Sequence, residues 1–487
     1  MYYDKLIFEL SQKDRKGYSL PYSEIKDYDL DDVYLRDDCP NLPEVSELDV
    51  VRHFTNVSFK NFGIEKGFYP LGSCTMKYNP KINQDIANMP EFAGLHPYQP
   101  VETVQGVLKV YYETQKILAE ISGLDTYSLN PYAGAHGELV GLMIMKAYHA
   151  SREDYKRTKI IVPDSAHGTN PASATVAGFE TIEVKSNQDG SVSVTDLRKV
   201  LSDEVAGIML TNPNTIGMFE KDILKIAELV HEAGGLLYYD GANLNPILGK
   251  VRPGDMGFDI MHINLHKTFS TPHGGGGPGS GPVGVTRALK PFLPKPVIRK
   301  AGDIYLIDDH TDESIGQISH FYGNMGVVIK AYAYLLSNGK EHLPEVAKYS
   351  TLNANYIKES LKDLYHLPVK GHCKHEFVFD GLEDKSTGVT TLDVAKRLLD
   401  YDVHPPTVYF PLLYKESLMI EPVETESKQT IDHFINIMRT IAKEAKDNPE
   451  LVKNAPHNTV VKRLDEALAA RKPIVKYKDL VESQDKE

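Results

Sequence analysis

An aspartate and a lysine stand at the ends of two apolar stretches, and both carry groups that can do chemistry. Asp240 closes the apolar run of LLYYDGAN (236–243), and Lys267 follows a β-type run in HINLHKTFS. An ionised Asp240 at the end of a buried strand is costly unless a cation or a set of donors faces it. A lysine at a strand end beside a cofactor can form a Schiff base. The alternative for Asp240 alone is an N-cap of the next element.

Two further segments offer groups to a bound anion or a flat ring. PYAGAHGELVGL (131–142) is a small-residue turn that opens into a helix, so the backbone N–H groups of Gly134, Ala135 and His136 could hold a phosphate. His167, in DSAHGTNPAS after an apolar run, could stack on a cofactor ring or transfer a proton near neutral pH. Taken singly, an ordinary helix start and a loop histidine bonded to backbone are the better explanations of these segments.

Weaker signals flank these four positions. Thr211, with Asn-Pro after it, ends another apolar run and could bond a cofactor hydroxyl, although Asn-Pro is also a plain turn. The glycine tract GGGGPGSGP (274–282) after Lys267 permits close backbone approach. A nucleotide phosphate loop would need Gly-Lys-Ser/Thr after these glycines, and the tract has none.

The order of these parts is more specific than any one of them. A phosphate turn, a ring-stacking histidine, an aspartate and then a lysine is the layout that a pyridoxal phosphate (PLP) enzyme of the aspartate-aminotransferase-like fold requires. In such a site the phosphate anchors the cofactor, and the aspartate keeps the pyridine nitrogen protonated so that the ring can accept electrons. The lysine holds the aldehyde as an imine.

The elements that must position these residues alternate along the chain. Apolar spacing predicts helices over 102–121 and 221–235, and short β-rich runs predict strands at 159–163, 205–213 and 236–243. This alternation predicts a parallel sheet covered by helices, in which ligands bind at the carboxyl ends of the strands. We expect an N-terminal segment with an active-site loop at 67–81, a large α/β domain, a smaller C-terminal α+β domain and a tail, at residues 1–100, 101–330, 331–446 and 447–487.

Composition narrows the class of protein. The 487 residues include 54 Lys+Arg and 67 Asp+Glu, a net charge of −13, which argues against nucleic acid or an anionic membrane as the main partner. No apolar run of about 18 residues exists to span a bilayer. The first 20 residues lack a basic start followed by an apolar stretch, so we expect no targeting segment there. Three cysteines are too few for a disulfide framework, and the single Cys in GHCKHE (371–376) makes a metal site there improbable. A soluble protein of a reducing compartment without a metal is expected.

Longer motifs carry a resemblance to a known family between about residues 60 and 472. PLGSCTMKYNPK, AGAHGE, DSAHGTNPASA, HINLHKTFSTPHGGGGPGSGPVGV, MIEPVETESK and APHNTVVKRLDEALAARKP resemble the glycine cleavage system P protein, glycine dehydrogenase (decarboxylating). In that family the enzyme is one long chain or two different subunits. This chain is about half the long form and has the cofactor lysine, so it is similar to subunit 2, the PLP-bearing β subunit.

The resemblance implies a fold and roles for single residues. The fold is the PLP-dependent transferase fold of type I, with a large, mostly parallel sheet domain and a smaller C-terminal α+β domain. Lys267 would be the Schiff-base lysine, Asp240 the pyridinium partner and His167 the stacking group. The phosphate-binding amides and further cofactor neighbours would come from Gly134, Ala135, His136, Thr211, Asn243 and His266.

The resemblance also implies an activity and its partners. The family decarboxylates glycine, releases CO2 and passes the aminomethyl group to the lipoyl arm of the H-protein. We expect subunit 1 as partner in an α2β2 assembly, a cytoplasmic location, and loops 67–81 and 274–282 as walls of a lipoyl channel. The alternatives are another type I PLP enzyme, such as a desulfurase, aldolase or decarboxylase of larger amino acids, or a non-catalytic partner subunit. Retention of both Asp240 and Lys267 argues against the last.

Overall fold

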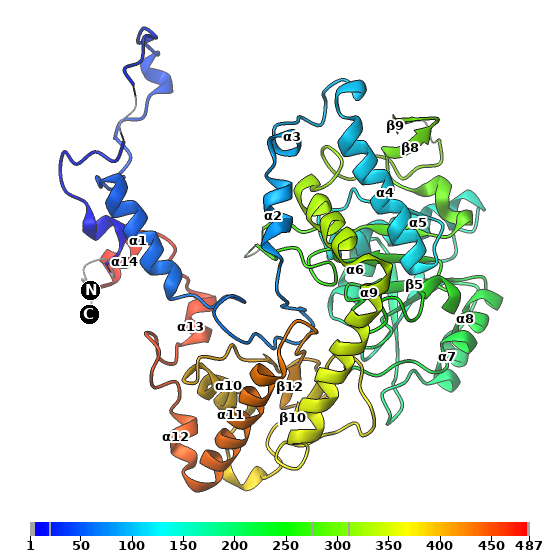
Figure 1. Cartoon of the computed structure of the whole chain (residues 1–487). Coiled ribbons are helices and arrows are strands. Elements are labelled where there is room, and N and C mark those ends of the chain that lie inside the picture. Colours follow the sequence, from blue (N-terminus) through cyan, green and yellow to red (C-terminus); the bar gives the residue numbers. More distant parts are fainter. Residues whose placement is uncertain (1–4, 19–20, 275–276, 310–311, 485–487) are drawn as a thin grey trace. The chain divides into compact units, whose positions relative to one another are not determined.

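The structure is a computed structural model that describes residues 5–18, 21–274, 277–309 and 312–484. The chain divides into two units, Gly67–His457, which holds every named strand, and Met1–Lys66 with Asn458–Glu487 (Figure 1). Helices α1 (Glu47–Phe59), α13 (Glu466–Arg471) and α14 (Tyr477–Gln484) belong to the second unit. Among the described residues, no helix is long and apolar enough to cross a membrane.

A seven-stranded sheet forms the centre of the larger unit, with strand order β1-β7-β6-β5-β4-β2-β3. The neighbours from β3 to β6 run parallel, whereas β7 is antiparallel to both of its neighbours. The mostly parallel sheet predicted from the alternating elements is therefore confirmed. Its strands are β1 (Thr126–Ser128), β2 (Lys159–Pro163), β3 (Glu180–Val184), β4 (Val205–Leu210), β5 (Leu236–Gly241), β6 (Ile260–Ile263) and β7 (Val283–Val285).

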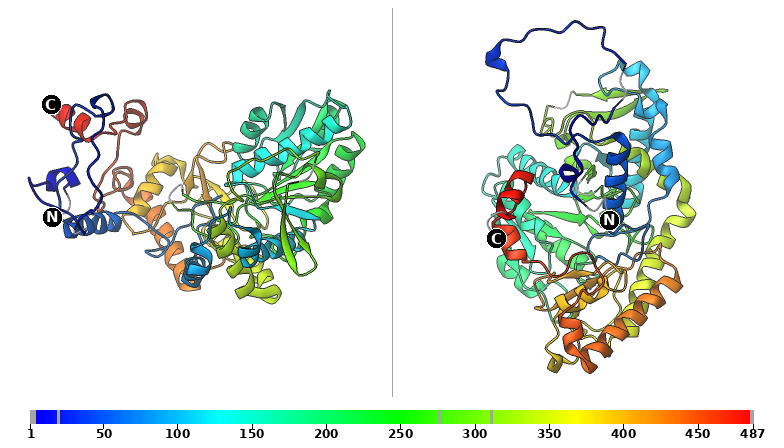
Figure 2. Two further views of the ribbon diagram at one scale, coloured as in Figure 1. Left: turned by 90° about the horizontal axis from the view of Figure 1, so that it is seen from above. Right: turned by 90° about the vertical axis from the view of Figure 1, so that its left-hand side faces the viewer.

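Successive residues of the buried strands point to opposite sides of the sheet, so both of its faces are apolar. Helices therefore cover both faces. In β5, Leu237 and Tyr239 belong to one core, and Leu236 and Tyr238 belong to the other. The first core includes residues of α4 (Gln105–Ser122), α7 (Val194–Val200) and α8 (Ile223–Glu232), and the second includes residues of α5 (Gly134–Ser151) and α6 (Thr169–Val176). Figure 2 shows helices on both sides of the sheet.

Helix ends follow the expected chemistry. The predicted helix over 102–121 is observed as α4, which ends where Gly123 adopts a left-handed φ of 73°. The predicted helix over 221–235 is observed as the shorter α8, and Gly234 follows it with φ 80°. Glycine adopts this conformation without steric cost, so both helices end at the residue that the sequence provides for it.

A smaller α+β part follows the large sheet, as expected. Its antiparallel sheet, β10-β12-β11, packs with helices α10, α11 and α12 around a separate core. Helix α9 (Met325–Leu361) bends at Gly339 and contacts α4 and α11, so it connects the large and small parts (Figure 1). The domain boundary expected at residue 330 falls within α9, and the four-segment division stays a prediction. The small part contains β10 (Phe377–Asp380), α10 (Thr391–Leu399), β11 (Thr407–Val408), β12 (Ser417–Ile420), α11 (Lys428–Asp447) and α12 (Pro449–Lys453).

Candidate active site

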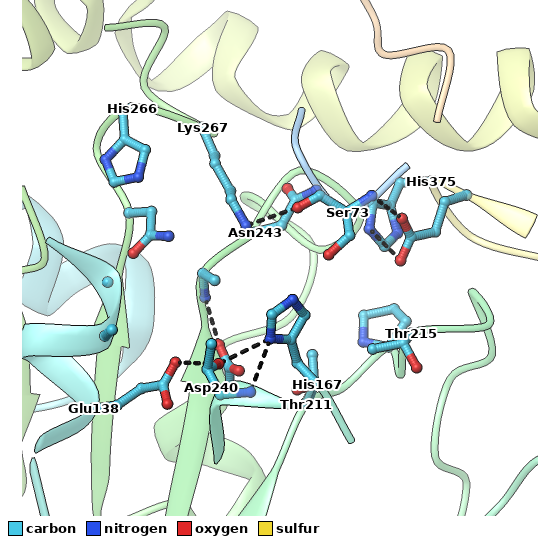
Figure 3. Close-up of a pocket in the computed structure, with 17 residues that line it drawn as sticks. Ser73, Glu138, His167, Thr211, Thr215, Asp240, Asn243, His266, Lys267 and His375 are labelled. Atoms are coloured by element: carbon cyan, nitrogen blue, oxygen red, sulfur yellow. Dashed lines mark hydrogen bonds and ion pairs between the residues drawn. The ribbon is translucent and has the colours of Figure 1, made fainter. Parts of the chain in front are cut away.

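A cavity of about 240 Å³ lies where the carboxyl ends of the parallel strands meet the start of α5 and residues of the small part (Figure 3). Eight of the nine residues predicted for the site line it, and His136 does not. The lining residues are Ser73, Gly134, Ala135, Glu138, His167, Thr169, Thr211, Pro213, Thr215, Asp240, Ala242, Asn243, Asn264, His266, Lys267, His375 and Glu376.

Lys267 lies in the turn that follows β6. The turn is closed by its N–H, which donates to the Asn264 carbonyl at 3.1 Å. The Lys267 Nζ donates to the Ser73 carbonyl at 2.9 Å and lines the cavity (Figure 3). A primary amine at this place can reach a ligand by breaking one hydrogen bond to a backbone carbonyl.

Asp240 lies near the end of β5 and is only 3% exposed. Its Oδ2 accepts from Asn170 Nδ2 at 2.9 Å, and its Oδ1 accepts from the Ala242 N–H at 3.1 Å and lies 3.4 Å from His262 Nε2. Burial raises the pKa of this carboxyl, but His262, the two hydrogen bonds and the Lys267 charge together lower it below its ordinary value. Asp240 is therefore ionised and suited to a cationic group.

His167 lies in the loop between β2 and α6. Its Nδ1 is 2.8 Å from the Thr169 hydroxyl, and its ring packs edge to face with Phe410 at 5.2 Å between centroids. Burial lowers the pKa of the imidazole, followed in size by an opposing effect of Asp240. The ring is therefore neutral at pH 7, which suits stacking on a flat aromatic ligand.

The first turn of α5 presents backbone donors to the cavity. The first helical hydrogen bond is donated by Gly137 N–H to the Ala133 carbonyl at 2.9 Å. The N–H groups of Gly134, Ala135 and His136 precede that bond, and such groups bind anions at helix N-termini. Gly134 and Ala135 line the cavity. This arrangement fits a phosphate.

Two buried oxygen atoms at the cavity have no hydrogen-bond partner in the described part of the chain. They are Thr211 Oγ1, directly after β4, and Asn264 Oδ1, directly after β6. Buried polar atoms normally have a partner, and unpaired ones mark places where a ligand or water completes the network. The unpaired atoms, the helix N-terminus, the anionic Asp240 and the Lys267 amine together fit a phosphate-bearing aldehyde with a basic ring nitrogen.

The three remaining predicted residues are partly engaged elsewhere. Asn243 Nδ2 donates to Thr75 Oγ1 and to Glu421 Oε1, both at 2.6 Å. His266 Nδ1 accepts from the Ser280 N–H at 3.4 Å, and burial with nearby positive charge lowers its pKa to about 3. His136 Nδ1 accepts from the Tyr132 N–H at 3.2 Å, and neither residue lines the cavity. Within the glycine tract 274–282, residues 275 and 276 lie outside the described residues.

The predicted active-site loop 67–81 is irregular and is held by acids from the small part. The Ser73 N–H donates to Glu376 Oε2 at 2.8 Å, and the Thr75 N–H donates to Glu421 Oε2 at 3.0 Å. Ser73 and Thr75 adopt left-handed φ values of 66° and 55°, which non-glycine residues rarely do. The buried acids therefore fix a strained turn whose carbonyl at Ser73 receives Lys267.

These acids form a buried cluster with His375, whose Nε2 lies 3.5 Å from Glu376 Oε1. One ligating atom from each of His375, Glu376 and Glu421 lies within 4.8 Å of the others, so the cluster could hold a metal ion. Burial and the Glu421 charge raise the pKa of Glu376 well above its ordinary value, and burial with the Lys267 charge lowers that of His375 to about 3. A metal cation at this cluster would have to displace the proton held by Glu376, and the positive charge of Lys267 nearby would repel it. Both effects oppose metal binding.

Sequence reasoning missed several lining residues. Glu138 is within one helical turn of Ala135 on the same side of α5, so helical spacing could have found it. His375 and Glu376 were considered only as metal ligands, and no local pattern shows that the small part brings them to Lys267. The missed residues are Glu138, Thr169, Pro213, Thr215, Ala242, Asn264, His375 and Glu376; Ser73 lies in the predicted loop.

Comparison with known proteins identifies relatives along the whole chain. The family model for the glycine cleavage system P-protein matches residues 30–304, and the model for the C-terminal domain of glycine dehydrogenase matches residues 346–463. The probable glycine dehydrogenase (decarboxylating) subunit 2 of Alkaliphilus oremlandii is 60% identical over 98% of this chain and 98% of its own length. That of Caldanaerobacter subterraneus is 61% identical over 98% and 99%.

Solved structures agree on the fold. A glycine decarboxylase (P-protein) of the glycine cleavage system matches with a TM-score of 0.71 at 20% identity, covering 84% of this chain and 94% of its own. An aspartate aminotransferase from Thermus thermophilus matches with a TM-score of 0.57 at 16% identity, covering 77% and 99%. The fold is that of type I PLP-dependent enzymes, and the chain belongs to the glycine cleavage system P-protein family, among the relatives named glycine dehydrogenase (decarboxylating) subunit 2.

Proposed function

We propose that this chain is the PLP-binding subunit of an enzyme that removes CO2 from glycine and passes the aminomethyl group to the lipoyl arm of the H-protein. The observation that carries this proposal is one cavity lined by the Asp240 carboxylate, the Lys267 amine and the first turn of α5. The names and high identity of the relatives support the choice of glycine as substrate. The type I fold alone would also allow a desulfurase or another decarboxylase.

Each residue has a defined task in this proposal. Lys267 Nζ would hold the cofactor aldehyde, the first-turn amides of Gly134 and Ala135 would bind the phosphate, and His167 would stack on the ring. Asp240, kept ionised by its neighbours, would hold the positive charge on the ring nitrogen. When bound, PLP supplies an electron-accepting ring that delocalises the charge left when CO2 departs.

Lys267 would have a second task in proton transfer. Its Nζ donates to the Ser73 carbonyl, so this carbonyl would position the amine whenever the amine is free. There it can keep a proton and return it to a neighbouring atom. Because the cavity walls bury Asp240 and partly bury the neutral His167, charges inside interact more strongly than they do in water.

A second subunit and a carrier belong to the same proposal. The relatives are named subunit 2, which supports a partner subunit 1. The assembly that we propose is α2β2. A lipoyl arm must reach Lys267, and loops 67–81 and 274–282 are the candidate walls, since Ser73 and Ser280 contact Lys267 and His266. If substitutions in both loops left exchange with the H-protein and glycine binding normal, this channel assignment would be wrong.

The direct test is glycine-dependent exchange of labelled bicarbonate, measured with subunit 1 and lipoylated H-protein present. We expect exchange with the native chain, none with Lys267→Ala and native rates with Lys290→Ala, an exposed lysine of the same chain. Absence of exchange by a chain that holds PLP on Lys267, or equal rates with larger amino acids, would contradict glycine as substrate.

A further inference from the structure

A hydrogen-bonded chain at the start of α6 connects a second buried acid to the His167 ring. Thr169 Oγ1 lies 2.8 Å from Glu138 Oε1 and 2.8 Å from His167 Nδ1. Ser173 Oγ donates to the other oxygen of Glu138 at 2.9 Å, and Asn170 donates to Asp240. Residues of α6 therefore form hydrogen bonds to both acids of the site, Glu138 and Asp240, and to the predicted ring-stacking histidine.

The protonation state of Glu138 decides which groups donate and which accept along these hydrogen bonds. A threonine hydroxyl has one proton to donate, so Thr169 cannot donate to Glu138 and to His167 at once. When Glu138 is ionised it must accept from Thr169, and the Thr169 oxygen then accepts from an Nδ1–H of His167. When Glu138 carries a proton it can donate to Thr169, which then donates to Nδ1, leaving the proton on Nε2.

We infer that Glu138 is a positioning residue: through the Thr169 hydroxyl, its charge state decides which ring nitrogen of His167 carries the proton. In one state Nε2 is a hydrogen-bond acceptor toward a ligand, and in the other it is a donor. The Thr169 N–H, 3.3 Å from Nδ1, supports the second state, because it donates only to an Nδ1 without a proton. The inference rests on the proposed function for its catalytic meaning.

The surroundings favour a switch near neutral pH. Burial and the Asp240 charge raise the pKa of Glu138 to about 7, although Thr169 and Ser173 donate to it. Burial lowers the pKa of His167 below its ordinary value, which favours the neutral ring while Glu138 titrates. The other titratable groups near these hydrogen bonds are Tyr238 on β5, His262 on β6 and Lys267 in the turn after β6.

The test is ¹⁵N NMR by magic-angle spinning on the full-length chain labelled at histidine, without cofactor. His167 is assigned by the signals lost in His167→Gln. Between pH 6 and pH 8 we expect its proton to move from Nε2 to Nδ1, with a midpoint near pH 7. Glu138→Gln and Thr169→Val should abolish the change, Thr169→Ser should restore it, and the exposed Glu120→Gln should leave it as in the native chain.

Two results would overturn the inference: a His167 tautomer that is constant from pH 6 to pH 8, or a transition that survives in Glu138→Gln. A second readout is the pH profile of bicarbonate exchange, whose inflection near pH 7 should be lost in Thr169→Val and kept in Thr169→Ser. Because the NMR experiment needs no PLP, its failure is distinct from failure of the proposed function, which borohydride labelling of Lys267 reports.

Discussion

At the scale of single residues, the site depends on a charge that is buried together with its partners. Asp240 is ionised because His262, Asn170 and Ala242 outweigh the effect of burial. We predict that Asp240→Asn, which keeps the shape and removes the charge, lowers the exchange rate roughly 100-fold or more. PLP should still attach to Lys267 in this variant. The exposed Asp255→Asn is the control, and a native rate in Asp240→Asn would contradict the assigned role.

A substitution at Thr211 should weaken cofactor binding without changing the stability of the protein. Its buried hydroxyl has no partner among the described residues, so Thr211→Val removes nothing that the protein alone uses. Replacement of an unpaired hydroxyl by an isosteric methyl is close to neutral for stability. A lost hydrogen bond to the cofactor would weaken PLP affinity by about tenfold. Thermal melts and PLP titrations check both, with the exposed Thr181→Val as control; an unchanged affinity would exclude contact with the cofactor.

Glu138 predicts how stability depends on pH. Its pKa is raised from 4.5 to about 7, so between these values the folded chain keeps a proton that the unfolded chain loses. The unfolding free energy contributed by Glu138 therefore falls as pH rises through this window. Relative to the native chain, Glu138→Gln should gain roughly 3 kcal/mol between pH 4.5 and pH 8 in urea unfolding. A constant difference across this range would show that Glu138 titrates normally.

At the scale of elements, loop 67–81 positions the Ser73 carbonyl that accepts a hydrogen bond from Lys267. A buried ion pair anchors this loop. Lys77 Nζ lies 2.5 Å from Glu424 Oε1 and 3.3 Å from the Tyr334 hydroxyl, and its side chain is 1% exposed. Lys77→Ala would leave the Glu424 charge buried without a counter-ion, with the Asn245 amide as its remaining donor, which costs about 3–5 kcal/mol. Chemical unfolding should report this loss. Lys443→Ala, which breaks the exposed pair with Asp447, should change nothing measurable, and equal effects of the two would refute the anchor.

Prediction from sequence succeeded for elements with strong local signals. Strand β2 was predicted at its observed bounds, because a run of buried β-branched residues needs no distant partner to be recognised. Asp240 and Lys267 could be placed at one sheet edge because parallel strands bring their carboxyl ends together. The predicted helix over 102–121 starts at 105 in the structure, since a separate turn occupies Val101–Thr103.

Contacts between distant segments could not be predicted. Glu376 and Glu421 bond the loop that contains Ser73 and Thr75, hundreds of residues away in the chain. Their positions depend on how the small sheet packs, and no single-sequence periodicity records that packing. For the same reason, the hydrogen bond from the Asn243 amide to Thr75 could not be predicted, although Asn243, expected as a cofactor neighbour, does line the cavity.

At the scale of the whole molecule, the cavity is assembled by the unit Gly67–His457 alone. Its lining residues come from the loop before α2 (Lys81–Ala87), from the start of α5, from four strand ends of the large sheet and from the residues just before β10. The fold therefore brings one amine, one ionised carboxylate and one helix N-terminus together from segments separated by most of the chain. The proposed function requires that Lys267 carry the cofactor.

The most direct test of that claim is visible absorbance of the purified chain with PLP before and after borohydride, followed by mass mapping of its peptides. We expect an absorbance band that borohydride bleaches and a pyridoxyl mass on the peptide that contains Lys267. A chain that shows no band and no label, or that carries the label on another lysine such as Lys77, would contradict it.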